Sequence, residues 1–295
     1  MRDVRNRQQS LLAAVCFCAA TSGLAEARPA NDAARRELLA VKAREAALRA
    51  RNGGEREWKA ISAEYNGLVK SHPRNAEIRS ARGDHLWELN ECDDAIREWL
   101  TAVKIDPKNE AALRQLGEAH LAKGEPMKSL KFFNRASEAA PKNAMTHFNI
   151  ANIACMFRHA LGRTEEDCFD LAIKHFAEAH RLAPRNAEFA QGYAQTFYML
   201  IRPDWKSALI AWKDCLNILP EKSFVLLHLA RVHMKLGDAD NARACLAEVT
   251  GTANERQKKR LEARIEAELS PETTPKPPEI ENSPKPGIDE APLPP

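Results

Sequence analysis

The sequence contains little glycine, few aromatic residues and no marked excess of either charge. Glycine accounts for 12 of the 295 residues, and aromatic residues make up 6% of the chain. Alanine and charged residues dominate its middle, a composition that argues against an all-β protein and favours stacked helices. The 44 Lys and Arg against 41 Asp and Glu leave a formal net charge of +3. Such a balance gives no general electrostatic reason to bind nucleic acid, so we expect no nucleic-acid partner.

Motifs that carry catalysis are also missing from the sequence. There is no glycine-rich phosphate loop and no HExxH, CxxC, CxxCH or GxSxG pattern. The nine histidines are spread along the chain, and paired acids such as Asp93 and Asp94 precede helices, where negative charge favours the helix N-terminus. We therefore expect a protein that is not an enzyme, with no metal, no cofactor and no small-molecule substrate.

The one long apolar run lies near the N-terminus. Three arginines within the first seven residues precede an apolar stretch at 11–20, and an Ala-Glu-Ala sequence at 25–27 offers a cleavage site. The run is shorter than the roughly 20 residues that a membrane-spanning helix needs. We expect residues 1–27 to be a signal peptide, cleaved near Ala27, and the mature chain to be periplasmic or secreted, in a cell envelope. The alternative is an uncleaved anchor that holds a cytosol-facing protein on a membrane.

The opposite end of the chain is rich in proline. Nine of the 17 prolines fall in residues 271–295. A segment with so little apolar content cannot bury enough surface to offset the entropy of ordering. Residues 270–295 are therefore predicted to form a disordered proline-rich tail.

Most of the remaining prolines mark an internal repeat. A Pro-Arg-Asn or Pro-Lys-Asn phrase stands at residues 73–75, 107–109, 141–143 and 184–186, and a weaker copy stands at 220–222. The spacings between the prolines are 34, 34, 43 and 36 residues. Proline ends one helix because it cannot continue the hydrogen-bond ladder, and asparagine is a good N-cap for the next helix. A period of this length is typical of stacked supersecondary units.

Within each period the sequence resembles the tetratricopeptide repeat. Leu113, Leu116 and Gly117 match the first helix of that repeat, and Ser129 and Phe133 match the second. The small residues let the two helices cross closely, and the aromatic residue fills the groove beside them. The resemblance implies an all-α fold, a right-handed α-solenoid of tetratricopeptide-like helix pairs.

The repeat divides the chain as follows. We expect residues 28–75 to form an N-terminal helical pair, a degenerate repeat, and residues 76–252 to form five tetratricopeptide-like repeats. We expect residues 253–269 to form a C-terminal capping helix, with Leu261, Ile265 and Leu269 facing inward. The basic residues on the outer face of this helix fit either a solvated cap surface or a basic docking patch; they are Arg256, Lys258, Lys259 and Arg260.

In the family that the sequence resembles, first helices line a concave groove that holds a peptide or a helix of a partner protein. The matching positions here have an aromatic, methionine-rich and amide-rich centre. They are Trp87, Arg114, Phe148, Asn149, Asn152, Met156, Gln191, Gln195, Tyr198, Met199, Phe224, His228 and Arg231. The resemblance implies a non-enzymatic scaffold that binds another protein. Two alternatives remain: several of these side chains pack against neighbouring repeats, or the protein is a structural component of an envelope assembly that associates with itself as a homo-oligomer.

Two cysteines stand at similar levels of one predicted hairpin. Cys155 lies four residues after Ala151, and Cys168 lies four residues before Ala172, which should face Ala151. In an oxidising compartment this pair is able to form a disulfide, and otherwise both remain free thiols.

Overall fold

The computed structural model describes residues 32–269, and within them the chain forms thirteen α-helices, one short 3₁₀ helix and no strand. Consecutive helices pack in pairs, which confirms the predicted all-α architecture of helical hairpins. The predicted signal peptide and the predicted proline-rich tail lie outside the described residues. No helix between residues 32 and 269 combines the length and the apolar character needed to cross a membrane.

The chain divides into two compact units, residues 1–119 and 120–295. In the first unit the described helices are α2 (Asp32–Ala50), α3 (Glu55–Ser71), α4 (Ala76–Glu88) and α5 (Cys92–Ile105), followed by α6 (Glu110–Ala122), inside which the division falls. The second unit contains α7 (Pro126–Ala139), α8 (Ala144–Met156), the 3₁₀ helix η1 (Arg158–Ala160), α9 (Glu165–Leu182), α10 (Ala187–Thr196), α11 (Trp205–Ile218), α12 (Lys222–Lys235), α13 (Ala239–Ala247) and α14 (Thr252–Leu269).

The repeated asparagines cap the helices that follow them. The side-chain oxygen of Asn75 accepts a hydrogen bond from the backbone N–H of Ile78, and that of Asn109 accepts one from Ala112. Asn143 and Asn186 each accept two such bonds at the starts of α8 and α10. Each cap satisfies backbone donors that have no partner inside the helix. The phrase read from the sequence therefore fixes where four first helices begin.

In the first unit, α4 and α5 cross closely around a tryptophan. Trp99 on α5 is 1% exposed. A Cβ atom at Gly83 on α4 would lie 2.5 Å from the Trp99 indole nitrogen, so only glycine fits at this crossing. The indole N–H donates to the Asp84 carboxylate at 2.9 Å and to the Ser80 carbonyl at 3.1 Å.

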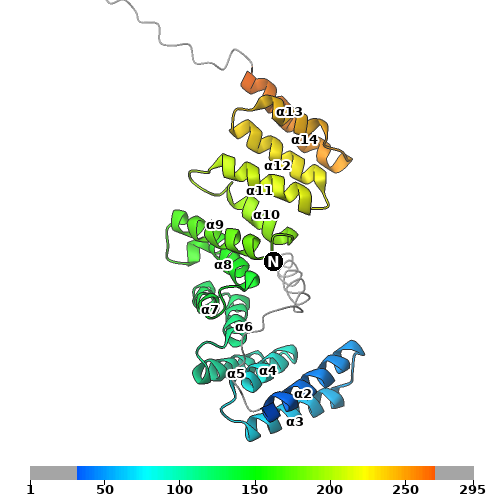
Figure 1. The fold of residues 1–295 in the computed structure, drawn as a ribbon, viewed down its shortest axis with the longest axis vertical. Coiled ribbons are helices and arrows are strands. Elements are labelled where there is room, and N and C mark those ends of the chain that lie inside the picture. Colours follow the sequence, from blue (N-terminus) through cyan, green and yellow to red (C-terminus); the bar gives the residue numbers. More distant parts are fainter. Residues whose placement is uncertain (1–31, 270–295) are drawn as a thin grey trace, which may run out of the picture. The chain divides into compact units, whose positions relative to one another are not determined.

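In the second unit, α8 and α9 meet through small residues, as the repeat pattern predicts. Ala151 on α8 and Ala172 on α9 are fully buried in one cluster with Phe176. Further along the chain, each helix from α10 to α13 packs on the next, and α14 packs on both α12 and α13 (Figure 1). Leu261 and Ile265 of α14 are buried in this core.

The two cysteines of the α8–α9 hairpin are free thiols in the structure. Both are buried, and the Cys168 thiol donates to the Arg158 carbonyl at 3.9 Å. Burial raises the pKa of both thiols, that of Cys155 to about 11. Both sulfurs are therefore protonated near neutral pH and behave as small apolar groups in the core.

Candidate functional site

The second unit has a cleft between α8, α9 and α10, called here the α8–α10 cleft. Its volume is about 270 Å³. It is lined by Phe148, Asn152, Cys155, Met156, Phe176, Glu188, Gln191, Gly192, Gln195, Thr196 and Met199. Six of these residues were predicted from the sequence to bind a partner: Phe148, Asn152, Met156, Gln191, Gln195 and Met199. They lie on α8, on α10 and just after α10, and these two helices are the first helices of two successive repeats.

Methionines and amides give the α8–α10 cleft its chemical character. The side chains of Met156 and Met199 are 62% and 42% exposed. Asn152, Gln191 and Gln195 are half-buried beside them. Carboxamide groups both donate and accept hydrogen bonds, and methionine adapts its shape to irregular apolar surfaces. The cleft thus offers pairing groups for a peptide backbone and flexible contacts for apolar side chains.

Phe148 forms the inner wall of this cleft and is not an exposed anchor. It is 8% exposed, with its ring 5.6 Å from that of Phe176 and 4.8 Å from that of Phe189. Burying an aromatic ring between three helices is more favourable than leaving it in water. At this position the alternative read from the sequence, packing against neighbouring helices, is the one that the structure shows.

A cluster of aromatic rings holds three more of the predicted binding residues. The ring of His228 stacks on that of Trp212 at 4.1 Å, and Phe224 meets both rings edge-on. The Tyr198 hydroxyl lies 3.2 Å from Nδ1 of His228. Burial, with a smaller contribution from the positive charge of Arg231, lowers the pKa of His228 to about 4. His228 is therefore a neutral packing residue near pH 7.

The pKa of His228 leads to a prediction about stability. Because its folded-state pKa lies below the ordinary value of 6.5, the unfolded chain binds more protons between pH 6.5 and 4. We expect the stability of the second unit to fall as the pH falls through this window, by on the order of 2 kcal/mol from His228. Urea unfolding at several pH values measures the slope, and His228→Gln should flatten it. An unchanged slope in that variant would contradict the assignment.

The remaining predicted residues lie elsewhere. Trp87 and Arg114 belong to the first unit, where Trp87 packs 5.6 Å from the Trp99 ring and Arg114 is paired with Glu118 at 2.7 Å. Asn149 is half-buried on α8 and is not among the residues that line the α8–α10 cleft. Arg231 lines a different cleft.

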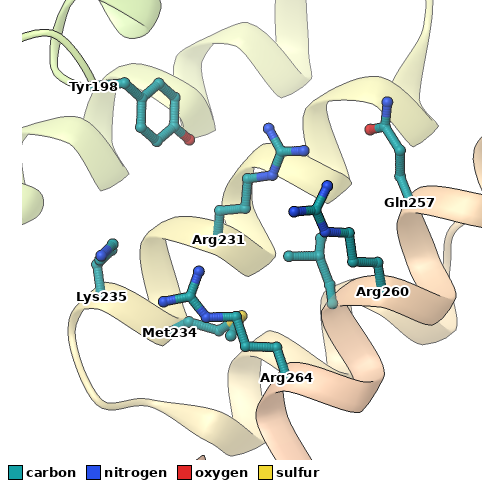
Figure 2. A pocket seen from close by; sticks show the side chains of 8 residues that line it. Tyr198, Arg231, Met234, Lys235, Gln257, Arg260 and Arg264 are labelled. Carbon is teal, nitrogen blue, oxygen red and sulfur yellow. The ribbon is translucent and has the colours of Figure 1, made fainter.

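That second cleft has a volume of about 540 Å³ and lies between α12 and α14 (Figure 2); we call it the cationic cleft. It is lined by Tyr198, Arg231, Met234, Lys235, Gln257, Arg260, Leu261 and Arg264. Arg260, which the sequence pattern predicted to lie on the outer face of the capping helix, is turned toward this cleft. Gln257 and Arg264 were missed, although their spacing around Leu261 places them on the same side of α14.

The first unit contains a polar cluster that the sequence did not reveal. His85 on α4, which is 1% exposed, contacts the Glu45 carboxylate through Nδ1 at 2.8 Å and the Ser62 hydroxyl through Nε2 at 2.8 Å. The Tyr65 hydroxyl donates to the other Glu45 oxygen at 2.7 Å. Burial opposes ionisation of Glu45, but the bonds from His85 and Tyr65 outweigh it and lower the pKa of Glu45.

This order of groups is that of a Ser-His-acid triad, but its surroundings do not suit catalysis. Ser62 lies inside α3, where neighbouring backbone N–H groups bond within the helix and are not free to stabilise an oxyanion. The Ser62 hydroxyl also donates to the Trp58 carbonyl at 3.1 Å. The arrangement satisfies the polar groups that α2, α3 and α4 bury together.

Helix pairs with these packing positions define an α-helical repeat protein. One tetratricopeptide repeat profile matches residues 40–110 and 80–144, and a second matches residues 225–255. The chain therefore contains tetratricopeptide repeats at residues 40–144 and 225–255. The family is generally one of non-catalytic scaffolds for protein–protein interaction.

Solved structures share this fold at low sequence identity. YrrB, described as a TPR protein with an unusual peptide-binding site, is 12% identical with a TM-score of 0.56, over 68% of this chain and 97% of that chain. PilF of Pseudomonas aeruginosa is 14% identical with a TM-score of 0.54, over 79% of this chain and 99% of that chain. The structure of Naa15/Naa10 bound to HypK-THB is 13% identical with a TM-score of 0.58, over 80% of this chain and 34% of that chain. A search of curated protein sequences found no match.

Proposed function

We propose that this protein is a non-enzymatic scaffold that binds a peptide or helix of a partner protein in the α8–α10 cleft. The observation that carries the proposal is the convergence of exposed methionines and half-buried amides from successive first helices on one cleft. A peptide backbone would pair with Asn152, Gln191 and Gln195, and an apolar side chain would lie between Met156 and Met199. The peptide-binding site ascribed to YrrB supports this use of the fold.

Gly192 lets the backbone of α10 lie close to the aromatic wall of the α8–α10 cleft. A Cβ atom there would lie 2.7 Å from Cε1 of Phe176 and 3.4 Å from Cε2 of Phe148. Any larger residue would push α10 away from the aromatic wall or move the Phe176 ring. The close approach sets the depth of the α8–α10 cleft, because the rings that form its wall pack directly on the backbone of α10.

The proposal is tested by selecting peptides from a displayed library on the full chain and measuring their affinity by fluorescence anisotropy. We expect Met156→Glu/Met199→Glu to weaken binding by about tenfold or more, since it places two charges where apolar side chains would sit. The matched control is Met127→Glu/Ile210→Glu, which changes two exposed apolar residues outside the cleft. Equal binding by both variants, with both folded by circular dichroism, would refute the cleft as the binding site.

Location in the cell envelope is part of the same proposal. It is supported by the basic start, the apolar run and the Ala-Glu-Ala sequence at residues 25–27. N-terminal sequencing of the protein from its native cells should find a mature chain that begins at Arg28. A chain that keeps residues 1–27 would favour the anchored, cytosol-facing alternative.

Self-association is a second candidate, favoured by large apolar side chains that are exposed on the second unit. Met127, Ile201 and Ile210 are each more than half exposed. Light scattering of the mature chain separates the two candidates, because a monomer at working concentrations excludes a structural role through homo-oligomers. An oligomer dispersed by Met127→Glu/Ile210→Glu would favour it.

A further inference from the structure

Positive charge converges on the cationic cleft from two helices. Arg231 and Lys235 are one turn apart on α12, and Arg260 and Arg264 are one turn apart on α14. Figure 2 shows the arginine side chains of both helices extending toward the opening between them. No Asp or Glu is among the described residues that line this cleft. Four cations around one opening create a local positive potential in a chain whose overall charge is nearly balanced.

Two of these arginines lack the carboxylate partners that other arginines of the chain have. Arg79 and Arg82 share Glu98, and Arg114 is paired with Glu118. Arg231 and Arg260 form no salt bridge with any side chain described in the range 32–267. Like charges held together disfavour one another, so a bound anion would stabilise this part of the fold. A guanidinium group binds a carboxylate through two parallel hydrogen bonds, which makes arginine well suited to that anion.

The floor of the cationic cleft is apolar. Leu261 is buried and Met234 is half-buried beneath the charged side chains. Tyr198 forms one wall, and its hydroxyl is held by His228. A small free anion would leave this floor in contact with water. A peptide that carries acidic side chains next to an apolar one would use both the guanidinium groups and the floor.

We propose that the cationic cleft binds an acidic segment of a partner protein. Carboxylates of the segment pair with Arg231, Arg260 and Arg264, while an adjacent apolar side chain packs on Met234 and Leu261. An acidic segment is favoured over a neutral or basic one because its charge is complementary to that of the Arg and Lys residues that line the cleft. The proposal is independent of the α8–α10 cleft, because the two clefts share no lining residue and either one can fail its test alone.

The test uses the full chain and a short fluorescein-labelled peptide in which glutamates flank a leucine. The same peptide with glutamines in place of glutamates is the control ligand. We expect saturable binding of the acidic peptide that weakens as salt is added, and little binding of the glutamine peptide. Arg231→Gln/Arg260→Gln should weaken binding by about tenfold or more, since it removes two charged hydrogen-bond donors.

A charge-matched variant separates the cleft from general attraction. Arg256→Gln/Lys259→Gln removes the same two charges from residues of α14 that do not line the cleft, and should change the affinity by less than about twofold. Equal weakening by both variants, or equal binding of the glutamine peptide, would overturn the proposal. So would binding of vesicles that contain anionic lipid, lost in the cleft variant, without binding of the acidic peptide. If Arg231→Gln/Arg260→Gln unfolds, Arg260→Gln/Arg264→Gln replaces it.

Discussion

Replacing Trp99 with alanine is expected to lower the free energy of unfolding of the first unit by about 4 kcal/mol. Trp99 is almost completely buried between α4 and α5, where Gly83 leaves room for its ring. Removing the indole opens a cavity at the point where the two helices cross. It also removes the N–H group that donates to Asp84 and to the carbonyl of Ser80. Packing and hydrogen bonding are lost together, and this accounts for the size of the effect.

The phenylalanine variant separates these two contributions. Burial raises the pKa of Asp84 to about 6, and the charge of Lys42 and the Trp99 hydrogen bond act against that rise. Trp99→Phe fills much of the space but leaves the Asp84 carboxylate without its indole donor. We expect a loss of about 2 kcal/mol.

Hydrogen exchange of peptides from the first unit, with urea unfolding of the whole chain, measures both losses. Leu100→Ala is the control, because Leu100 is the next residue of α5 and its side chain is exposed. We expect it to cost less than about 0.5 kcal/mol. A Trp99→Ala loss as small as that of Leu100→Ala would contradict the close crossing of α4 and α5.

Glu45→Ala is expected to destabilise the first unit by about 3 kcal/mol. The change removes the acceptor for both His85 and Tyr65, whose polar groups are buried. Neither group can reach water in the folded state, so each loses a hydrogen bond that it keeps in the unfolded chain. Glu45→Gln retains one acceptor and should cost less than the alanine variant.

A surface pair that joins the same two helices provides the control for Glu45. Arg44 on α2 is paired with Glu64 on α3, and the two side chains are 55% and 35% exposed. Glu64→Ala should change the free energy of unfolding by less than about 1 kcal/mol. Comparable losses in Glu45→Ala and Glu64→Ala, measured by urea unfolding, would show that the buried cluster does not hold α2, α3 and α4 together.

The sequence by itself determined the helices and the order in which they pair. Proline and asparagine at a constant spacing fix where first helices begin, because the cap depends only on residues within the same turn. The small residues Ala151 and Ala172 could likewise be assigned to the crossing of α8 and α9. The resemblance to the tetratricopeptide repeat also predicted the amide and methionine residues of the α8–α10 cleft, because it implies which positions of the first helices line the groove.

Only the tertiary structure decided which side chains are exposed and which distant residues meet. Phe148 stands at a groove position, yet its ring is buried against α9 and α10. Glu45 and His85 are 40 residues apart, and Arg231 and Arg260 meet at one cleft from helices that are not consecutive. The period of a helix specifies a face but not the angle at which another helix crosses it. That angle depends on the side chains of both helices, so these contacts could be assigned only once the helices were packed.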